Sequence, residues 1–367
     1  MVLETLQLTN FKNYAEARVN FSSKINVLVG KNGSGKTNLL DAIYYLALTR
    51  SAVSPADTYC IRHGEQHFFL RGIFRQANTR NEISTGYQSG RKIFKEGANE
   101  YQKLSDHIGK YPVVLIAPDD TDLVKEGSEL RRKFFDSIIS QLDHIYLEAL
   151  IQYNQALRQR NSLLKMFAET NRFDAVALDS YDDILIRQGQ TVFAKRLLFI
   201  NDYAPIFRRY YNFIVDDEHA EIVYNSELKS ISFEEGIRQS RSKDLFLQRT
   251  TFGIHRDDYQ FTLGDGDLKR LGSQGQQKSF IIALKLAQFE IIKQQKGFKP
   301  LLLLDDIFDK LDDFRIRKLL ALIKNDELGQ LFITDARPDR TAALLKEIDV
   351  SSSVFVAGGG KLTEYEQ

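Results

Sequence analysis

Apolar and polar residues alternate over short stretches in the first 125 residues. The pattern predicts strands at 68–74 and 82–87, the start of another at residue 93, and an apolar run at 111–117 that stops at Pro118. Short strands bounded by turn residues are typical of domains that mix helices and sheets. We therefore expect the segment 1–125 to be α/β.

The middle of the chain is poor in residues that break helices. Gly189 is the one glycine between Gly127 and Gly236, and Pro205 is the one proline between Pro118 and Pro300. This scarcity predicts long helices, and apolar spacing places them at about 129–167 and 180–213. Because their apolar positions keep no strict heptad, we expect a compact helical lobe at 126–245 rather than a long coiled coil.

Strand patterns return in the last part of the chain. Residues 259–263 alternate, a hairpin-type turn follows, and 280–293 has helical spacing. The short apolar runs at 301–304 and 331–334 are typical of parallel strands that are buried on both faces. The predicted fold class is α/β: one core, made of 1–125 and 246–367, interrupted by an inserted α-helical lobe.

Composition restricts the class of protein without deciding it. The chain has 367 residues, 27% of them charged, and a net charge of +1, so any nucleic-acid site must come from local clusters. Cys60 is the sole cysteine, which favours a reducing compartment. Neither a signal segment nor an apolar run long enough to span a membrane stands out. We expect a cytoplasmic protein.

A glycine-rich motif lies between an apolar, strand-like run at 25–29 and a helical pattern at 39–47. Gly30, four further residues and then Gly-Lys-Thr at 35–37 fit the P-loop pattern with nothing missing. A strand before the loop and a helix after it are the context that the motif requires, so a turn without a ligand fits less well. We predict a site for a nucleoside triphosphate.

Each residue type in this motif has a role in binding phosphate. The glycines let several N–H groups turn toward one anion, and the following helix adds the positive end of its dipole. Lys36 reaches the outer phosphates, and the Thr37 hydroxyl is a ligand for Mg²⁺. The predicted ATP-binding residues are Gly30, Lys31, Asn32, Gly33, Ser34, Gly35, Lys36, Thr37 and Asn38.

Two carboxylates follow the apolar run at 301–304. Ligands of such sheets bind at the carboxyl ends of the strands, so we predict that Asp305 binds Mg²⁺ and that Asp306 orients or deprotonates the attacking water. The alternative is an acidic loop with no role in catalysis.

A second motif precedes the helix predicted at 280–293. Its Ser-x-Gly-Gln core, at 273–276, resembles the signature motif of ABC-type ATPases, and Ser273 is a plausible N-cap. The segment 308–312, with Asp309, stands where that class carries its D-loop. The resemblance implies an ATP-dependent homodimer, in which Ser273 and Gln276 of one copy complete the catalytic site around Lys36 and Asp306 of the other.

Blocks spread over nearly the whole chain resemble those of the RecF family of bacterial recombination mediators. They are 8–14, 41–47, 117–120, 131–136, 153–165, 253–258 and 272–278. The resemblance implies an ABC-type P-loop ATPase head with an inserted helical lobe, and binding of DNA at gaps or junctions. It also implies RecO and RecR as partners in loading recombinase, with slow ATP hydrolysis releasing the protein.

The chain departs from the family pattern at several positions. Arg50-Ser-Ala-Val53 replaces a more basic run, and Asp309 stands at a position that is usually serine. Many ABC ATPases carry a glutamate after the strand aspartate and a histidine in a later switch, and the chain has Asp306 and Thr334-Asp335 at the corresponding places. These shorter, acidic replacements favour slow turnover. His255, in a family-like block, is either structural or adjacent to a ligand.

Basic residues gather at three places that are candidate DNA contacts. They are Arg131 to Lys133, Arg158 with Arg160 and Lys165, and Arg238 with Arg241 and Lys243. Solvated helix faces account for such clusters equally well.

Three other classes of protein also carry P-loops. In a transporter ATPase the signature lies far closer to the P-loop, whereas here Ser273 follows Lys36 by 237 positions. An SMC-like or Rad50-like organiser needs much longer coiled coils, and a P-loop kinase has no use for the 273–276 motif.

Overall fold

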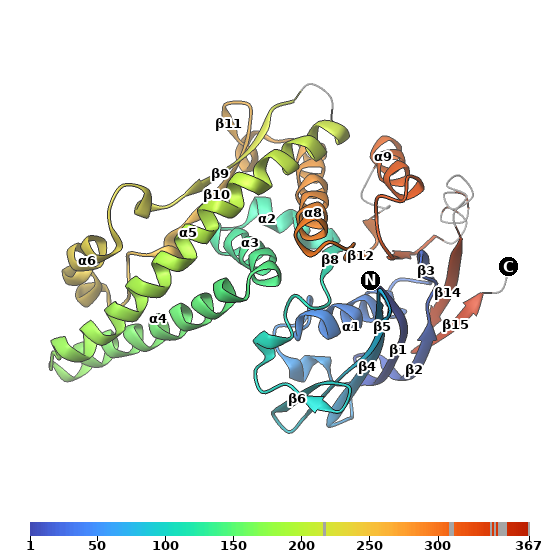
Figure 1. The fold of residues 1–367 in the computed structure, drawn as a ribbon, viewed down its shortest axis with the longest axis horizontal. Coiled ribbons are helices and arrows are strands. Elements are labelled where there is room, and N and C mark those ends of the chain that lie inside the picture. The colour runs from blue at the N-terminus through green and yellow to red at the C-terminus, as the bar shows by residue number, and fades with distance from the viewer. Residues whose placement is uncertain (216–217, 308–311, 338–339, 341–342, 344–350, 366–367) are drawn as a thin grey trace. The chain divides into compact units, whose positions relative to one another are not determined.

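The computed structural model describes residues 1–215, 218–307, 312–337, 340, 343 and 351–365. The chain divides into two compact units, one made of residues 1–120 and 281–367 and the other of residues 121–280. Figure 1 shows the strands of the first unit and the long helices of the second. No helix in the described ranges combines the length and the apolar character needed to span a bilayer.

The first unit contains an antiparallel sheet in the order β2-β1-β4-β5-β6-β7. Its strands are β1 (Val2–Phe11), β2 (Tyr14–Asn20), β4 (His67–Gln76), β5 (Thr79–Gln88), β6 (Arg91–Glu96) and β7 (Asn99–Glu100). Alternate residues of β4 are buried, as the alternation at 68–74 predicts.

The second sheet of this unit has the order β15-β14-β3-β13-β12-β8 and is parallel except at β15. The strands are β3 (Ile25–Val29), β8 (Val113–Ile116), β12 (Leu301–Leu304), β13 (Leu331–Asp335), β14 (Ser352–Gly358) and β15 (Lys361–Tyr365). Every residue of β3, β12 and β13 is buried, as expected of short apolar strands covered on both faces.

Helix α1 (Lys36–Leu48) packs against strands of both sheets and joins their cores into one cluster. Ten of its 13 residues are buried, so its position is fixed from all sides rather than by one amphipathic face. The first unit also contains helix α9 (Asp313–Lys324) and the later part of α8.

The second unit is mainly helical, with a small antiparallel sheet. Its helices are α2 (Asp122–Lys125), α3 (Ser128–Leu142), α4 (His144–Thr170), α5 (Ala175–Ile214), α6 (Phe233–Leu247) and α7 (Leu268–Leu271), followed by the start of α8 (Gln274–Lys296). The sheet consists of β9 (Ala220–Asn225), β10 (Asp258–Leu263) and β11 (Gly266–Asp267).

The helices differ from the expected ones in two places. The segment 129–167 is two helices, because Asp143 has an extended backbone and its side chain caps α4 by accepting the Tyr146 N–H at 3.0 Å. Helix α5 begins five residues before the expected start at 180 and continues through Pro205. Its N-cap, Asp174, accepts the Ala177 N–H at 3.0 Å.

The second boundary of the insertion also differs from the expected one. The sequence places the end of the helical lobe at residue 245, whereas the compact unit continues to Phe280. The reason is that β10 pairs with β9 from Asp258↔Asn225 to Leu263↔Ala220, which binds the following segment to the insertion. The signature-like motif at 273–276 therefore belongs to the second unit, not to the one that carries the P-loop.

Candidate nucleotide-binding site

The P-loop connects the end of β3 to the start of α1. Gly30 and Gly35 have φ values of +155° and +108°, which only glycine adopts readily. A Cβ on Gly30 would lie 2.5 Å from the Ala357 carbonyl oxygen, and one on Gly35 would collide with the Asn13 side chain. The loop is therefore glycine-rich for steric reasons, and it is packed tightly on both sides.

The loop surrounds a cavity of about 190 Å³ at the start of α1. Its lining residues are Asn32, Gly33, Gly35, Lys36, Thr37, Asn38 and Asp306. Lys36 is almost fully buried, and its ammonium donates to the carbonyl oxygens of Gly30 at 2.9 Å and Lys31 at 3.3 Å. The structure thus brings six of the nine predicted loop residues together with Asp306 around one space, whereas Gly30, Lys31 and Ser34 do not line it.

These residues fit a bound triphosphate. The Ser34 hydroxyl oxygen is buried and has no hydrogen-bond partner among the described residues, and a buried polar group without a partner costs free energy that a ligand can recover. The Lys36 ammonium and the amino end of a 13-residue helix supply positive charge beside it. Phosphate is the ligand that this combination favours.

The site also fits a magnesium ion. The Thr37 hydroxyl lies 2.9 Å from each carboxylate oxygen of Asp305, so two oxygen donors of the kind that Mg²⁺ prefers are adjacent. Burial raises the pKa of Asp305, and the nearby Asp306 adds to the effect. A cation at this position would compensate both carboxylates.

Asp306 occupies an unusual backbone position. Its φ of +44° is in the left-handed region, at a cost of about 1–3 kcal/mol for a residue other than glycine. Its N–H donates to the Thr334 hydroxyl at 2.8 Å, and that hydroxyl donates to Asp305 at 2.8 Å. Thr334 on β13 thus fixes both carboxylates at the end of β12, while its neighbour Asp335 is buried and paired with Arg340 at 2.9 Å.

The sequence did not identify two residues that support the P-loop. Asn13 donates to the Ser34 carbonyl at 3.1 Å and accepts from the Asn38 amide at 2.7 Å, and the Tyr14 hydroxyl donates to the Gly35 carbonyl at 3.0 Å. Both lie where β1 turns into β2. The segment 8–14 resembles the family, but no sequence pattern indicates that it contacts a loop about 20 residues later.

The signature-like motif caps helix α8. The Ser273 N–H donates to the Gln276 side chain at 2.7 Å, and the Gln276 N–H donates back to the Ser273 hydroxyl at 3.2 Å, which is a reciprocal capping box. Gln276 also donates to Glu218 at 2.8 Å. Ser273 is exposed. Its predicted role opposite a second P-loop remains a prediction for the dimer.

Part of the predicted D-loop, including Asp309, lies at 308–311, outside the described residues. Asp312 is described, and it caps α9 by accepting the Arg315 N–H at 2.9 Å.

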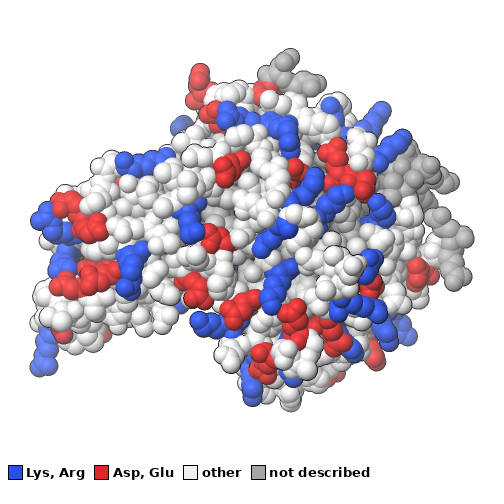
Figure 2. Space-filling model, in the orientation of Figure 1, with Lys and Arg blue, Asp and Glu red and all other residues white. Residues whose placement is uncertain are grey.

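Most of the basic clusters are committed to ion pairs. Arg131 makes a two-point contact with Asp258, at 2.8 and 2.9 Å, and Arg241 pairs with Asp179 and Asp182. Arg160 is fully buried and cannot meet DNA in this fold. On the face in Figure 2, basic and acidic side chains are interspersed.

His255 is structural in the described part of the chain. Its two ring nitrogens lie 2.8 Å from the Tyr153 hydroxyl and 3.1 Å from the Thr250 carbonyl oxygen. Both nitrogens are therefore occupied within the protein, which favours the structural role of the two that the sequence left open.

The loop, the strand-end carboxylates and the capped α8 motif define an ABC-type P-loop ATPase head with an inserted helical lobe. The model of the RecF/RecN/SMC N terminal domain matches residues 2–357. The chain belongs to the RecF family.

Curated relatives and solved structures agree with this assignment. The chain is 44% identical to the DNA replication and repair protein RecF of Cytophaga hutchinsonii, over 99% of this chain and 97% of that one. It is 45% identical to the RecF protein of Flavobacterium johnsoniae, over 97% of this chain and 99% of that one. A solved structure of the recombination mediator protein RecF-ATP in the RecFOR pathway superposes with a TM-score of 0.90 and 30% identity, over 100% and 98% of the two chains.

More distant structures share the fold alone. The Smc head domain with an extended coiled coil from Pyrococcus furiosus has a TM-score of 0.58 at 17% identity, over 100% of this chain and 96% of that one.

Proposed function

We propose that this chain is an ATP-dependent DNA-binding protein of recombinational repair, which dimerises on ATP and acts with RecO-type and RecR-type mediators to load recombinase at gapped DNA. Family membership supports the role, because the named relatives are DNA replication and repair proteins and one solved relative is a RecF-ATP structure of the RecFOR pathway. The observation that carries the proposal is the contact of Thr37 with Asp305, which joins the P-loop to the carboxyl end of β12.

The residues divide the work of hydrolysis between them. Lys36 binds and orients the outer phosphates, and Thr37 with Asp305 holds Mg²⁺, which when bound neutralises charge on the phosphate oxygens. Asp306 lines the same cavity and accepts the proton of the attacking water. Its side chain is one methylene shorter than glutamate and is held on a left-handed backbone, so its reach is limited. We therefore expect slow ATP hydrolysis, which suits a protein that alternates between two states rather than one that turns over rapidly.

Dimerisation explains why Ser273 is exposed. It stands at the amino end of a 23-residue helix, where the helix dipole favours an anion. In the dimer, this end of α8 faces the phosphate bound by the other copy. ATP then favours the closed dimer because it contacts both copies only in that state.

The proposal is tested by substituting Ser273→Arg and measuring mass by light scattering with and without ATP and Mg²⁺. The unaltered chain should dimerise with ATP, and the variant should stay monomeric and hydrolyse no ATP while still binding it. Ser232→Arg is the matched control, since Ser232 caps α6 in the same way, by accepting the Glu235 N–H at 3.2 Å, and has no predicted role in the dimer. It should dimerise normally.

Lys36→Ala tests the contribution of Lys36 to nucleotide binding. Loss of a charged hydrogen-bond donor costs about 1.5–3 kcal/mol, so a fluorescent ATP analogue should bind roughly 10- to 150-fold more weakly. A dimer formed by Ser273→Arg, or an unaltered chain that stays monomeric with saturating ATP, would refute the proposal.

A further inference from the structure

A second pocket lies in the first unit, away from the P-loop. It has a volume of about 570 Å³ and is lined by residues that precede three parallel strands: Lys24 before β3, Lys299 before β12 and Gln330 before β13. The nucleotide site is at the carboxyl ends of these strands, so this pocket is at the opposite edge of the sheet. Nothing in the proposed ATPase cycle uses it.

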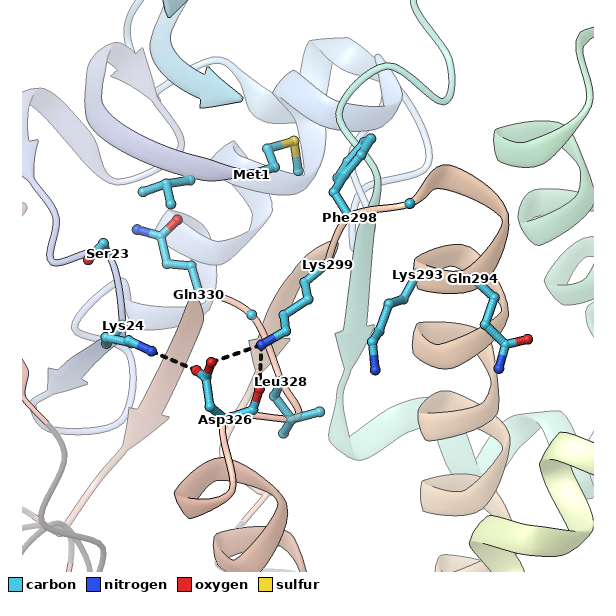
Figure 3. A pocket seen from close by; sticks show the side chains of 13 residues that line it. Met1, Ser23, Lys24, Lys293, Gln294, Phe298, Lys299, Asp326, Leu328 and Gln330 are labelled. Carbon is cyan, nitrogen blue, oxygen red and sulfur yellow. Dashed lines mark hydrogen bonds and ion pairs between the residues drawn. The ribbon is translucent and has the colours of Figure 1, made fainter. Parts of the chain in front are cut away.

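The charged residues of the pocket are mostly basic. Lys24 and Lys299 both contact one carboxylate, that of Asp326, at 2.6 and 3.2 Å, and Lys299 also donates to the Asp326 carbonyl (Figure 3). Lys293, on α8, pairs with Glu290 of the same helix at 3.2 Å. Three lysines and one aspartate line the pocket, and together with Glu290, the partner of Lys293, these side chains carry a net charge of +1. The positive charge is thus only partly compensated.

The rest of the lining is apolar or already satisfied. Met1, Val2, Phe298 and Leu328 contribute apolar surface. Gln330 is buried, and its side chain is fully engaged with the N–H and carbonyl of Leu3, at 2.7 and 2.9 Å, and with the Ser22 carbonyl at 2.7 Å. A ligand therefore meets ammonium groups on one side and hydrocarbon on the other.

We infer that this pocket binds an acidic peptide segment of a partner protein. Carboxylates of the peptide pair with Lys293 and Lys299, and an aliphatic or aromatic side chain packs on Phe298. Charge complementarity selects an acidic partner, and the apolar wall selects a peptide over inorganic phosphate. A nucleic-acid strand fits less well, because Phe298 is the one aromatic ring in the lining and successive bases need successive stacking surfaces.

The experiment is panning of a random-peptide phage library against the full chain, followed by fluorescence anisotropy with the enriched peptides. Enriched peptides should be acidic and contain a large apolar residue. Reversing the charge of two lysines, Lys293→Glu with Lys299→Glu, should weaken their binding about tenfold or more, equivalent to about 1.4 kcal/mol. Lys361→Glu, at an exposed lysine of β15, is the matched control and should leave the affinity unchanged.

A measurement on the unaltered chain removes any dependence on how the variant folds. Adding the peptide should slow amide hydrogen exchange at 293–299 and 326–330. Failure to enrich peptides, enrichment of neutral or basic ones, equal affinity for the double variant, or protection elsewhere would each overturn the inference. Displacement of the peptide by a single-stranded oligonucleotide that protects the same residues would assign the pocket to nucleic acid instead.

Discussion

Two arginines of α4, two positions apart, have opposite environments. Arg160 is fully buried between Asp182 and Asp244, with contacts of 2.5 and 2.7 Å, and it also donates to Thr250. Arg158 is exposed. The sequence grouped them as one basic cluster, because charge alone does not reveal which side of a helix faces the core.

This difference predicts unequal effects of the same substitution. Arg160→Met should lower the free energy of unfolding by about 3–5 kcal/mol, because two buried carboxylates lose their cation. Arg158→Met should change it by less than about 0.5 kcal/mol. Urea unfolding followed by circular dichroism measures both. Equal stability of the two variants would contradict the assignment of Arg160 as a structural residue.

His255 makes stability depend on pH. Burial lowers the pKa of His255 to about 4, whereas an unfolded histidine titrates near 6.5. Between these values the unfolded chain binds more protons, so stability falls as the pH drops from about 6.5 to 4. The loss from this residue is at most about 3 kcal/mol.

Urea unfolding at pH 7 and pH 5 checks this expectation. His255→Gln should be less stable at pH 7 but should lose less stability between the two pH values than the unaltered chain. His107, also buried and with its pKa lowered to about 4 by burial, still contributes in the variant. His219→Gln is the matched control at an exposed position. An unchanged pH difference in His255→Gln would rule out this source of acid sensitivity.

At the scale of elements, the packing of α5 on α6 depends on glycine. A Cβ on Gly189 of α5 would overlap the ring of Phe233 on α6, whereas one on Gly236 of α6 would overlap the ring of Phe252, which follows that helix in the chain. Alanine is the better helix former by about 1 kcal/mol, so helix propensity and packing make opposite predictions for a substitution here.

We expect packing to dominate. Gly189→Ala should lower the unfolding free energy by about 1–3 kcal/mol, the usual cost of overfilling a core. Gly358→Ala is the control, because no atom of the described residues outside its immediate chain neighbours lies within 4 Å of a Cβ built at this position. Thermal unfolding of both variants measures the effect. A more stable Gly189→Ala would show that Phe233 moves aside at little cost.

The sequence predicted elements best where local pattern decides the structure. Apolar runs gave β12 and β13, and the glycine spacing gave the P-loop. The sequence did not predict the break at Asp143, because the apolar pattern continues through this residue. In the structure the extended backbone of Asp143 separates the two helices, and its side chain caps the start of α4. The sequence also missed the extension of the insertion to Phe280, because the pairing of β9 with β10 joins segments more than 30 residues apart. Asn13, which the sequence did not identify as a site residue, reaches the P-loop through a contact between segments that are not adjacent in the chain.

At the scale of the whole molecule, a net charge of +1 means that DNA affinity must come from assembly and local clusters. An ATP-bound dimer offers two copies of each basic surface. Affinity for duplex DNA should therefore fall more steeply with salt when ATP is present, with a log–log slope of about −0.9 per phosphate contacted.

Anisotropy of a labelled duplex over a salt series, with and without ATP, measures the two slopes. Ser273→Arg is the control, and its slope should be the same in both conditions because the proposed dimer should not form in this variant. Identical slopes for the unaltered chain would show that ATP adds no contacts to the phosphate backbone.

The bonds of Lys36 to its own loop have a kinetic consequence. Because the ammonium holds the Gly30 and Lys31 carbonyls, an incoming nucleotide must wait until these bonds open. In stopped-flow mixing with a fluorescent ATP analogue, the observed rate should therefore level off as concentration rises, at the frequency with which the lysine releases the loop. A rate that rises linearly throughout would mean that the loop opens faster than nucleotide arrives. A rate that levels off would mean that Lys36, the proposed ligand of the outer phosphates, also sets how quickly the protein responds to ATP.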